Sequence, residues 1–293
     1  MATLYTHQSE NVTKTWVLMT GFLVIVIGLG FLFSQLYSNP NILYGFIAFS
    51  IIMNIVSFWY SDKIALASTH AESADPAEYR ELHRIVENLA ITAGLPKPRV
   101  YVINDPAPNA FATGRNKEHA AIAVTTGLLQ ILDRSELEGV IAHELAHIGN
   151  RDILLSTVVV VLVGFVSLLA DFFMQSMWFR SNDDDNRGGG ILMIVGIVLA
   201  LLSPVIATLI QLAISRKREF LADASGALLT RYPEGLANAL RKISNYNQPL
   251  QHASNATAHL YISNPFGKTA GFVHNLFMTH PPTDKRIEAL LKE

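Results

Sequence analysis

The sequence predicts an α+β fold that combines four transmembrane helices with a mainly helical domain holding a small β-sheet. Two observations carry this prediction: a deficit of charge, and long apolar runs separated by polar segments with mixed helix and strand patterns. Half of the 293 residues are hydrophobic and only 16% are charged, whereas soluble domains usually carry about 25% charged residues. Part of the chain is therefore expected to lie in a lipid bilayer.

The first apolar stretch is long enough for two membrane spans. No charged residue occurs between Lys14 and Asp62, and one span needs about 20 apolar residues. Pro and Asn within 38–41 mark a turn, which predicts helices near 16–37 and 42–60. The apolar part is too long for the core of a cleavable signal peptide, so this hairpin is expected to stay as an anchor.

Two further apolar runs follow the polar middle of the chain. One covers 153–170 and continues past Asp171 to about 178, and the other extends from 190 to about 214. An acid within a span is often functional, but Asp171 is close to the expected outer end, where it could simply reach water. The alternative is that one of the four apolar runs forms a buried helix of a soluble domain, and the run with Asp171 is the first candidate for this.

The positions of Lys and Arg predict the orientation in the membrane. Only Arg180 and Arg187 would lie on one side of the spans, and the richer side is cytoplasmic. The other side would carry Lys14, Lys63, Arg151, Arg216, Lys217 and Arg218. The predicted organisation is a cytoplasmic N-terminus (1–15), a transmembrane hairpin (16–60), the first part of a cytoplasmic domain (61–152), two spans with an external loop at about 179–189 (153–214), and the second part of that domain (215–293).

The polar segments show helix and strand patterns. Apolar residues at helical spacing, together with end signals, predict helices over 78–93, 215–232 and 233–246 and a short one from Thr283. Short β-prone runs predict strands over 99–103, 111–114 and 120–126. Ser135 and Glu138 match a capping box, which predicts the start of another helix. Residues 247–275 are predicted to form a loop.

Charge and cysteine content exclude several kinds of site. The net charge is −2, with no basic surplus, so no nucleic-acid partner is expected. The chain has no Cys, which excludes disulfides, thiolate ligands and cysteine nucleophiles. Any metal must therefore be held by His, Asp or Glu.

The helix that begins near Ser135 carries His-Glu-Leu-Ala-His at 143–147. Because positions i and i+4 share a helix face, His143 and His147 could bind one metal ion. Zinc with three protein ligands keeps a position open for water and lowers the pKa of that water to about 7. Glu144 would then act as the general base in peptide hydrolysis. The alternative is two histidines on a helix surface.

A later helix offers the third ligand. Glu219 and Asp223 again stand at i and i+4. This spacing suits Glu219 as a zinc ligand and Asp223 as the acceptor for the free ring N–H of a ligand histidine. The alternative is that Glu219 pairs with Arg216 or Lys217 on a solvated face, and the spacing alone leaves both open.

Four segments, in this order, resemble those of the HtpX-type membrane zinc proteases, which are gluzincins related to the CAAX prenyl protease. They are Asn-Ala-Phe-Ala-Thr-Gly at 109–114, the motif at 143–147, Glu-Phe-Leu-Ala-Asp at 219–223, and Thr-His-Pro-Pro at 279–282 ahead of Arg286. The resemblance covers nearly the whole chain. It implies a zincin-like fold, one Zn²⁺ per chain and Glu219 as the third ligand.

The resemblance also implies roles around the motif. Asn109, Ala110 and Phe111 would contact substrate, and either His280 or Arg286 would stabilise the oxyanion of the tetrahedral intermediate. The alternative for His280 is a rigid turn before the last helix. Gluzincins bind substrate as an added strand along a sheet edge, and the 120–126 strand is the candidate edge here.

Together these features predict a zinc metalloendopeptidase of the bacterial cytoplasmic (inner) membrane. The resemblance implies that it cleaves misfolded or damaged membrane proteins in quality control and the stress response, and we also expect self-cleavage. One alternative is an intramembrane site-2-type protease, which the polar residues around the motif disfavour. Another is a non-enzymatic membrane scaffold, which the intact Glu144 disfavours. Residues 247–275 or 61–76 are expected to cover the cleft until substrate displaces them.

Overall fold

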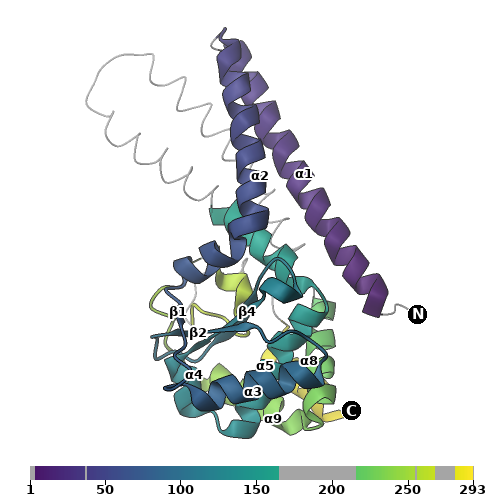
Figure 1. Cartoon of the computed structure of the whole chain (residues 1–293), viewed down its shortest axis with the longest axis vertical. Coiled ribbons are helices and arrows are strands. Elements are labelled where there is room, and N and C mark those ends of the chain that lie inside the picture. Colours follow the sequence, from purple (N-terminus) through teal and green to yellow (C-terminus); the bar gives the residue numbers. More distant parts are fainter. Residues whose placement is uncertain (1–3, 37, 165–215, 255, 268–280, 293) are drawn as a thin grey trace.

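A long helical hairpin stands above a globular part (Figure 1). The computed structural model describes residues 4–36, 38–164, 216–254, 256–267 and 281–292. The hairpin consists of α1 (Leu4–Leu36) and α2 (Pro40–Ser68). Asn39 caps α2 by accepting a hydrogen bond from the Asn41 N–H at 3.0 Å, and Pro40 occupies the first turn, where no N–H is needed.

Both helices of the hairpin are long and apolar enough to cross a membrane, over Ser9–Gln35 and Pro40–Ser68. The two helices predicted first are therefore present as candidate spans, but α1 begins at Leu4 instead of about 16 and α2 extends to Ser68 instead of about 60. Hydropathy marks the apolar segment of a helix. The helix itself continues where polar residues such as Asn11 and Asp62 find buried places against the globular part.

The third apolar run begins as a helix, Asp152–Gly164, that leaves α5 (Arg134–Gly149) at an angle of 85°. Arg151 forms the bend with a φ of 60°. Leu155, Val159 and Leu162 of this helix pack with Leu18 and other apolar residues of α1. The remainder of this run with Asp171, and the whole of the fourth run, lie outside the described residues.

The described part of the chain contains one mixed sheet with the order β1-β2-β4-β3. Its strands are β1 (Glu72–Ser73), β2 (Arg99–Ile103), β3 (Ala110–Thr113) and β4 (Ala121–Thr125). β4 pairs in parallel with β2 and antiparallel with β3. The predicted edge strand, 120–126, is therefore wrong as an edge: it is β4, which lies inside the sheet, and β3 forms the edge. Every residue of β4 is buried, as expected for a strand with neighbours on both sides.

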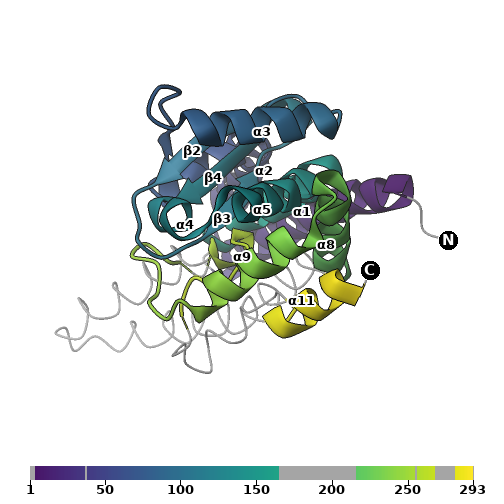
Figure 2. The same ribbon diagram turned by 90° about the horizontal axis from the view of Figure 1, so that it is seen from below.

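Helices cover the sheet and one another (Figure 2). In that view α5 lies between the sheet with α3 (Arg80–Thr92) on one side and α8 (Arg216–Thr230) and α9 (Pro233–Asn245) on the other, with α11 (Thr283–Lys292) outside them. Shorter elements are η1 (Lys117–His119), α4 (Thr126–Ile131) and η2 (Ala258–Leu260). Since α5 is enclosed, its side chains have fixed surroundings on almost every face.

The start of α5 differs from the predicted capping box by two residues. Asp133 is the N-cap: its carboxylate accepts the Glu136 N–H at 3.0 Å, and the Glu136 carboxylate accepts the Asp133 N–H at 2.8 Å. Ser135 lies inside the helix and donates to Asp133. Both pairs fit the capping-box spacing, and the extended backbone at Asp133 decides between them.

Candidate metal centre

α5 places the two motif histidines on one face, next to each other. The Nε2 atoms of His143 and His147 are 3.1 Å apart, and the rings meet edge to face at 4.7 Å. His143 is fully buried, and Glu144 is 2% exposed. The predicted spacing on one helix face is thus present, and these histidines do not lie on a helix surface.

α8 brings Glu219 to the same point. Its carboxylate oxygens lie 3.6 Å from His147 Nε2 and 3.9 Å from His143 Nε2. The close approach of α8 requires Gly226, because a Cβ there would lie 3.0 Å from the backbone N of His143. The alternative contacts of Glu219 with Arg216 or Lys217 on a solvated face do not fit a side chain buried in this cluster.

The donor set fits a metal ion. One ligand atom from each of His143, His147 and Glu219 lies within 4.8 Å of the others. Tetrahedral zinc with bonds of about 2.0–2.1 Å places its ligand atoms roughly 3.3 Å apart. Two imidazoles and a carboxylate are also a usual ligand set for zinc in hydrolases. This cluster therefore suits a metal, and zinc before others.

His143 is oriented by an acid that is itself held by an arginine. Asp223 lies 2.9 Å from His143 Nδ1, and Arg286 donates two hydrogen bonds to Asp223 at 2.8 and 2.7 Å. Burial raises the pKa of Asp223, but Arg286 and His143 outweigh it and hold the pKa at about 2. Burial lowers the pKa of His143 to about 4 in spite of Asp223. The ring is therefore neutral, and its N–H on Nδ1 directs the Nε2 lone pair at the metal position.

His147 is oriented from a different side. Its Nδ1 lies 2.9 Å from Asp152 at the start of the next helix. Asn11 of α1 donates to Asp152 at 2.6 Å and accepts a hydrogen bond from Arg218 at 2.9 Å. Burial lowers the pKa of His147, but the hydrogen bond with Asp152 and the charge of Glu219 outweigh it and raise the pKa to about 9.

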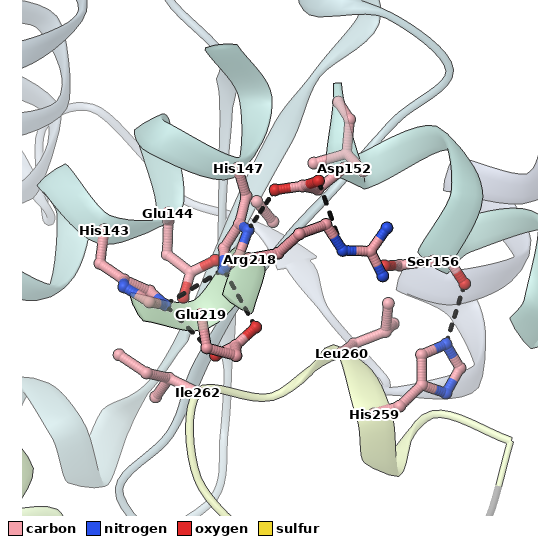
Figure 3. Close-up of a pocket in the computed structure, with 12 residues that line it drawn as sticks. His143, Glu144, His147, Asp152, Ser156, Arg218, Glu219, His259, Leu260 and Ile262 are labelled. Carbon is pink, nitrogen blue, oxygen red and sulfur yellow. Dashed lines mark hydrogen bonds and ion pairs between the residues drawn. The ribbon is translucent and has the colours of Figure 1, made fainter. Parts of the chain in front are cut away.

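Glu144 projects from α5 beside the three candidate ligands (Figure 3). Burial raises its pKa to about 7, although the nearby His147 and Arg286 and a hydrogen bond from the Ala112 backbone oppose the shift. A carboxyl with a pKa near neutrality can both accept and return a proton, which is the property that general acid–base catalysis needs. The contact with Ala112 places Glu144 against the edge strand β3.

A cavity of about 30 Å³ opens beside the cluster, which is room for about one water molecule. The segment around η2 contributes His259, Leu260 and Ile262 to its lining. Figure 3 shows His259 reaching the Ser156 backbone oxygen, at 2.9 Å. The predicted loop 247–275 therefore contributes buried residues to the site over the part that the structure describes.

The other predicted residues lie at varying distances from this cavity. The Asn109 side chain pairs with the backbone of Ser263 at 3.0 and 3.3 Å, and the Ala110 carbonyl accepts the Ile262 N–H at 2.9 Å. Phe111 is fully buried and packs edge to face on Tyr261, so it belongs to the core. His280 lies outside the described residues.

Arg286 was one of two candidates for an oxyanion contact. Its side chain is 2% exposed, and besides Asp223 it donates to the Ile262 carbonyl at 3.1 Å. Its guanidinium also lies 3.4 Å from His143 Nε2 and 4.0 Å from Glu219, so Arg286 adjoins two candidate ligands, and its contact with an oxyanion stays a prediction.

Sequence reasoning missed Asp152 and its two neighbours, Asn11 and Arg218. Asp152 stands five residues after His147, a spacing that does not share a face on one helix. The bend at Arg151 brings it back. Asn11 is 141 residues away from Asp152 along the chain, so no local pattern could relate them.

The class of enzyme follows from the position of Glu144. Glu144 lies beside the three candidate ligands and is not one of them, which is the position of the proton acceptor in the HExxH metalloproteases. Apolar helices attach this domain to a membrane. The profile of peptidase family M48 matches residues 76–293. The chain belongs to this family, and its curated relatives are HtpX protease homologues.

The relatives match over nearly their full length. An HtpX homologue from Caldanaerobacter subterraneus subsp. tengcongensis is 49% identical over 98% of this chain and 97% of its own. A homologue from Pyrococcus furiosus is 48% identical over 95% of this chain and 94% of its own. A homologue from Lactobacillus helveticus is 45% identical over 98% of this chain and 99% of its own. A crystal structure of Ste24p from S. mikatae has a TM-score of 0.50 at 18% identity and covers 98% of this chain and 67% of that one. This last likeness concerns the fold.

Proposed function

We propose that this membrane metalloprotease is a zinc endopeptidase of the bacterial cytoplasmic membrane that cleaves misfolded or damaged membrane proteins at the cytoplasmic face. The observation that carries the proposal is the cluster of His143, His147 and Glu219, with His143 and Glu219 buried and with Glu144 beside it in contact with the edge strand β3. The HtpX homologues and the apolar hairpin support the membrane location. Four spans, with both parts of a zincin-like domain on the cytoplasmic side, complete the proposed arrangement.

The chemistry divides between the ion and the chain. In the proposed enzyme His143, His147 and Glu219 hold the ion. A bound zinc supplies Lewis acidity, which polarises the scissile carbonyl and acidifies the attacking water. Glu144 accepts the proton of that water and returns it to the leaving amine, as its pKa of about 7 allows. Asp223 and Asp152 keep the two rings in the orientation that ligation needs.

The edge strand β3 is the proposed place for an extended substrate. Ala110 and Ala112 turn their backbone groups away from β4, toward the site: Ala110 bonds to Ile262, and Ala112 to Glu144. A substrate that adds a strand here must take the place of Ile262. The segment 258–263 is therefore proposed to cover the cleft at rest, and substrate to displace it.

The proposed activity is tested by cleavage of an unfolded protein with the detergent-purified, zinc-loaded chain. Glu144→Gln keeps all three ligands but removes the base, so the rate should fall by about 10²–10⁴-fold while the zinc content is unchanged. Glu138→Gln on the exposed face of α5 is the matched control and should retain the rate. If Glu144→Gln and a chelator-treated sample cleave as fast as the parent, the activity belongs to a contaminant and the scaffold hypothesis gains.

The covering segment is tested by a reversible crosslink. Because the chain has no Cys, Ala110→Cys with Ile262→Cys introduces the only two thiols. Oxidation should abolish cleavage and reduction should restore it, whereas either single variant should be insensitive to oxidation. Full activity of the crosslinked protein, with the crosslink verified by mass spectrometry, would show that substrate enters by another route.

A further inference from the structure

A second cavity, of about 570 Å³, lies beside the end of α2. α2 contributes five of its lining residues. The other four come from the start of β2 and from the turn between β3 and β4. The lining residues are Ile55, Trp59, Tyr60, Asp62, Lys63, Arg99, Arg115, Glu118 and His119.

The cavity lies at the level where α2 leaves its apolar stretch. Asp62 and Lys63 are the first charged residues after Lys14. Trp59 and Tyr60 directly before them are 52% and 50% exposed, and such aromatic residues gather at the boundary between the hydrocarbon and the head groups. This pattern predicts that the cavity lies at the depth of phospholipid head groups.

Arg115 is held in this cavity without a carboxylate partner in the part of the chain that the structure describes. Its guanidinium lies 4.7 Å from the Trp59 ring centre and donates to His119 Nε2 at 2.7 Å. His119 Nδ1 in turn is 2.7 Å from the Asn116 side-chain oxygen. An oxygen acceptor at Nδ1 requires the proton there, so Nε2 accepts from Arg115. The remaining N–H groups of Arg115 are available to a ligand.

The other charges of the cavity do not cancel Arg115. Asp62 is neutralised by Arg99, 2.6 Å away. Lys63 lies over the Tyr60 ring at 5.4 Å and has no ion pair within 4.0 Å among the described residues. Glu118 is 3.9 Å from Lys117, a neighbour that does not line the cavity. The surplus is positive.

The turn that carries Arg115 is rigid. Gly114 has a φ of 142°, and a Cβ there would lie 2.6 Å from the His119 carbonyl oxygen. Its N–H reaches the Thr157 hydroxyl at 3.4 Å, and Thr113 is 3.1 Å from the same hydroxyl. The turn is thereby attached to the helix Asp152–Gly164, so the position of Arg115 relative to that helix is set before any ligand binds.

We propose that this cavity binds the phosphate of an anionic phospholipid from the adjacent leaflet, with Arg115 and Lys63 as its donors. The guanidinium fork matches phosphate oxygens, and anionic lipids attract basic residues at the membrane surface. A soluble phosphate would use the same donors. A lipid also places its acyl chain along the exposed apolar face of α2, where Ile55 and Ile52 are 53% and 57% exposed, and this favours the lipid.

The test uses the full chain, zinc-loaded, with Glu144→Gln to prevent self-cleavage. Its melting temperature in a neutral detergent is followed against short-chain phosphatidylglycerol, short-chain phosphatidylcholine and inorganic phosphate. Phosphatidylglycerol should raise the melting temperature in a saturable way. Arg115→Gln should weaken its apparent affinity by roughly ten- to a hundredfold, the worth of a charged hydrogen bond. Arg241→Gln is the matched control, since Arg241 is exposed on α9 and bonded to Asn238.

Three results would overturn the proposal. If Arg115→Gln and Arg241→Gln bind phosphatidylglycerol with equal affinity, Arg115 does not form the proposed site. The zinc content and the melting temperature without lipid show whether Arg115→Gln folds. If it does not fold, Lys63→Gln tests the site independently. An equal effect of phosphatidylcholine shows that negative charge is not recognised. An equal effect of inorganic phosphate at the same concentration shows a soluble anion site in place of a lipid site.

Discussion

Each of the two histidines of the candidate metal centre is held by an aspartate, but different parts of the chain fix the two aspartates. Asp223, which holds His143, is itself fixed by Arg286 of α11, so this half is built within the globular domain. Asp152, which holds His147, begins the helix that continues the third apolar run, and Asn11 of α1 bonds to it. One candidate ligand is thus fixed within the globular part and the other by the helix Asp152–Gly164 together with α1 of the hairpin.

The supports also give the two rings different protonation. His143 has a pKa of about 4 and is neutral at pH 7, because burial dominates. His147 has a pKa of about 9, because Asp152 and Glu219 outweigh burial, and it carries an extra proton in the metal-free protein. His143 can therefore bind a metal ion directly, whereas His147 must release a proton first. The following variants and conditions separate the two halves.

Removal of Arg286 should have the largest effect. Arg286→Met leaves the charge of Asp223 buried without its partner, which costs about 3–5 kcal/mol of unfolding free energy. Arg218→Met on the membrane side should cost less, because Arg218 approaches Asp152 only to 3.7 Å. Thermal unfolding of the two variants measures the difference. Equal losses would mean that the two halves are supported alike.

The pH dependence of metal binding should follow His147. Zinc needs its neutral ring, so between pH 6 and 8 the affinity should rise about tenfold per pH unit, with close to one proton released per zinc. Calorimetry in two buffers of different ionisation enthalpy counts that proton. In the metal-free protein the raised pKa of His147 adds to the free energy of unfolding. This contribution is fully present below about pH 6.5, the ordinary pKa of histidine, and is lost as the pH rises through about 9. An affinity that is flat from pH 6 to 8 would contradict the extra proton.

Replacing the two acids should then distinguish the rings. Asp152→Asn and Asp223→Asn should each weaken zinc binding by about 10–100-fold. Asp152→Asn also lowers the pKa of His147, so part of its loss is offset at pH 7 and the full loss emerges near pH 9. No such offset is expected for Asp223→Asn, since His143 is already neutral. Zinc titrations at both pH values compare the variants.

Asn11→Ala should have the smallest effect. It removes the hydrogen bonds to Asp152 and from Arg218, which is worth about 1 kcal/mol, or roughly a fivefold loss in zinc affinity. Thr13→Ala, on the exposed face of α1, is the control. Identical zinc affinities of the two variants would show that α1 does not support the metal centre.

Much of the fold follows from local patterns in the sequence. The apolar stretch predicts both helices of the hairpin, the β-prone run at 99–103 coincides with β2, and Pro233 marks the start of α9. These succeed because each signal lies inside the element that it specifies. The predicted capping box failed for a related reason: two overlapping four-residue patterns offered the same chemistry, and only the backbone at Asp133 selects one.

What the sequence did not predict depends on contacts between distant segments. The order of strands is set by which apolar faces pack together, and local patterns do not show this. The prediction that β4 is an edge is wrong, although its continuous apolar run is typical of an interior strand. Helical spacing pairs His143 with His147 and Glu219 with Asp223, but only the family resemblance favours Glu219 as the third ligand, and the structure brings these residues together. Asp152 was missed because its approach to His147 depends on a bend, and no spacing rule describes one.

The bend at Arg151 has a consequence for how this enzyme can vary. Residues 150 and 151 both end the helix that carries the motif and fix the direction of the next helix, Asp152–Gly164. One inserted residue would rotate Asp152 by about 100° about the new helix axis and remove its oxygen from His147. In the proposed membrane arrangement, the height of the catalytic centre above the lipid is therefore coupled to the geometry of ligation, and a variant that reaches further from the membrane would have to rebuild half of its metal site.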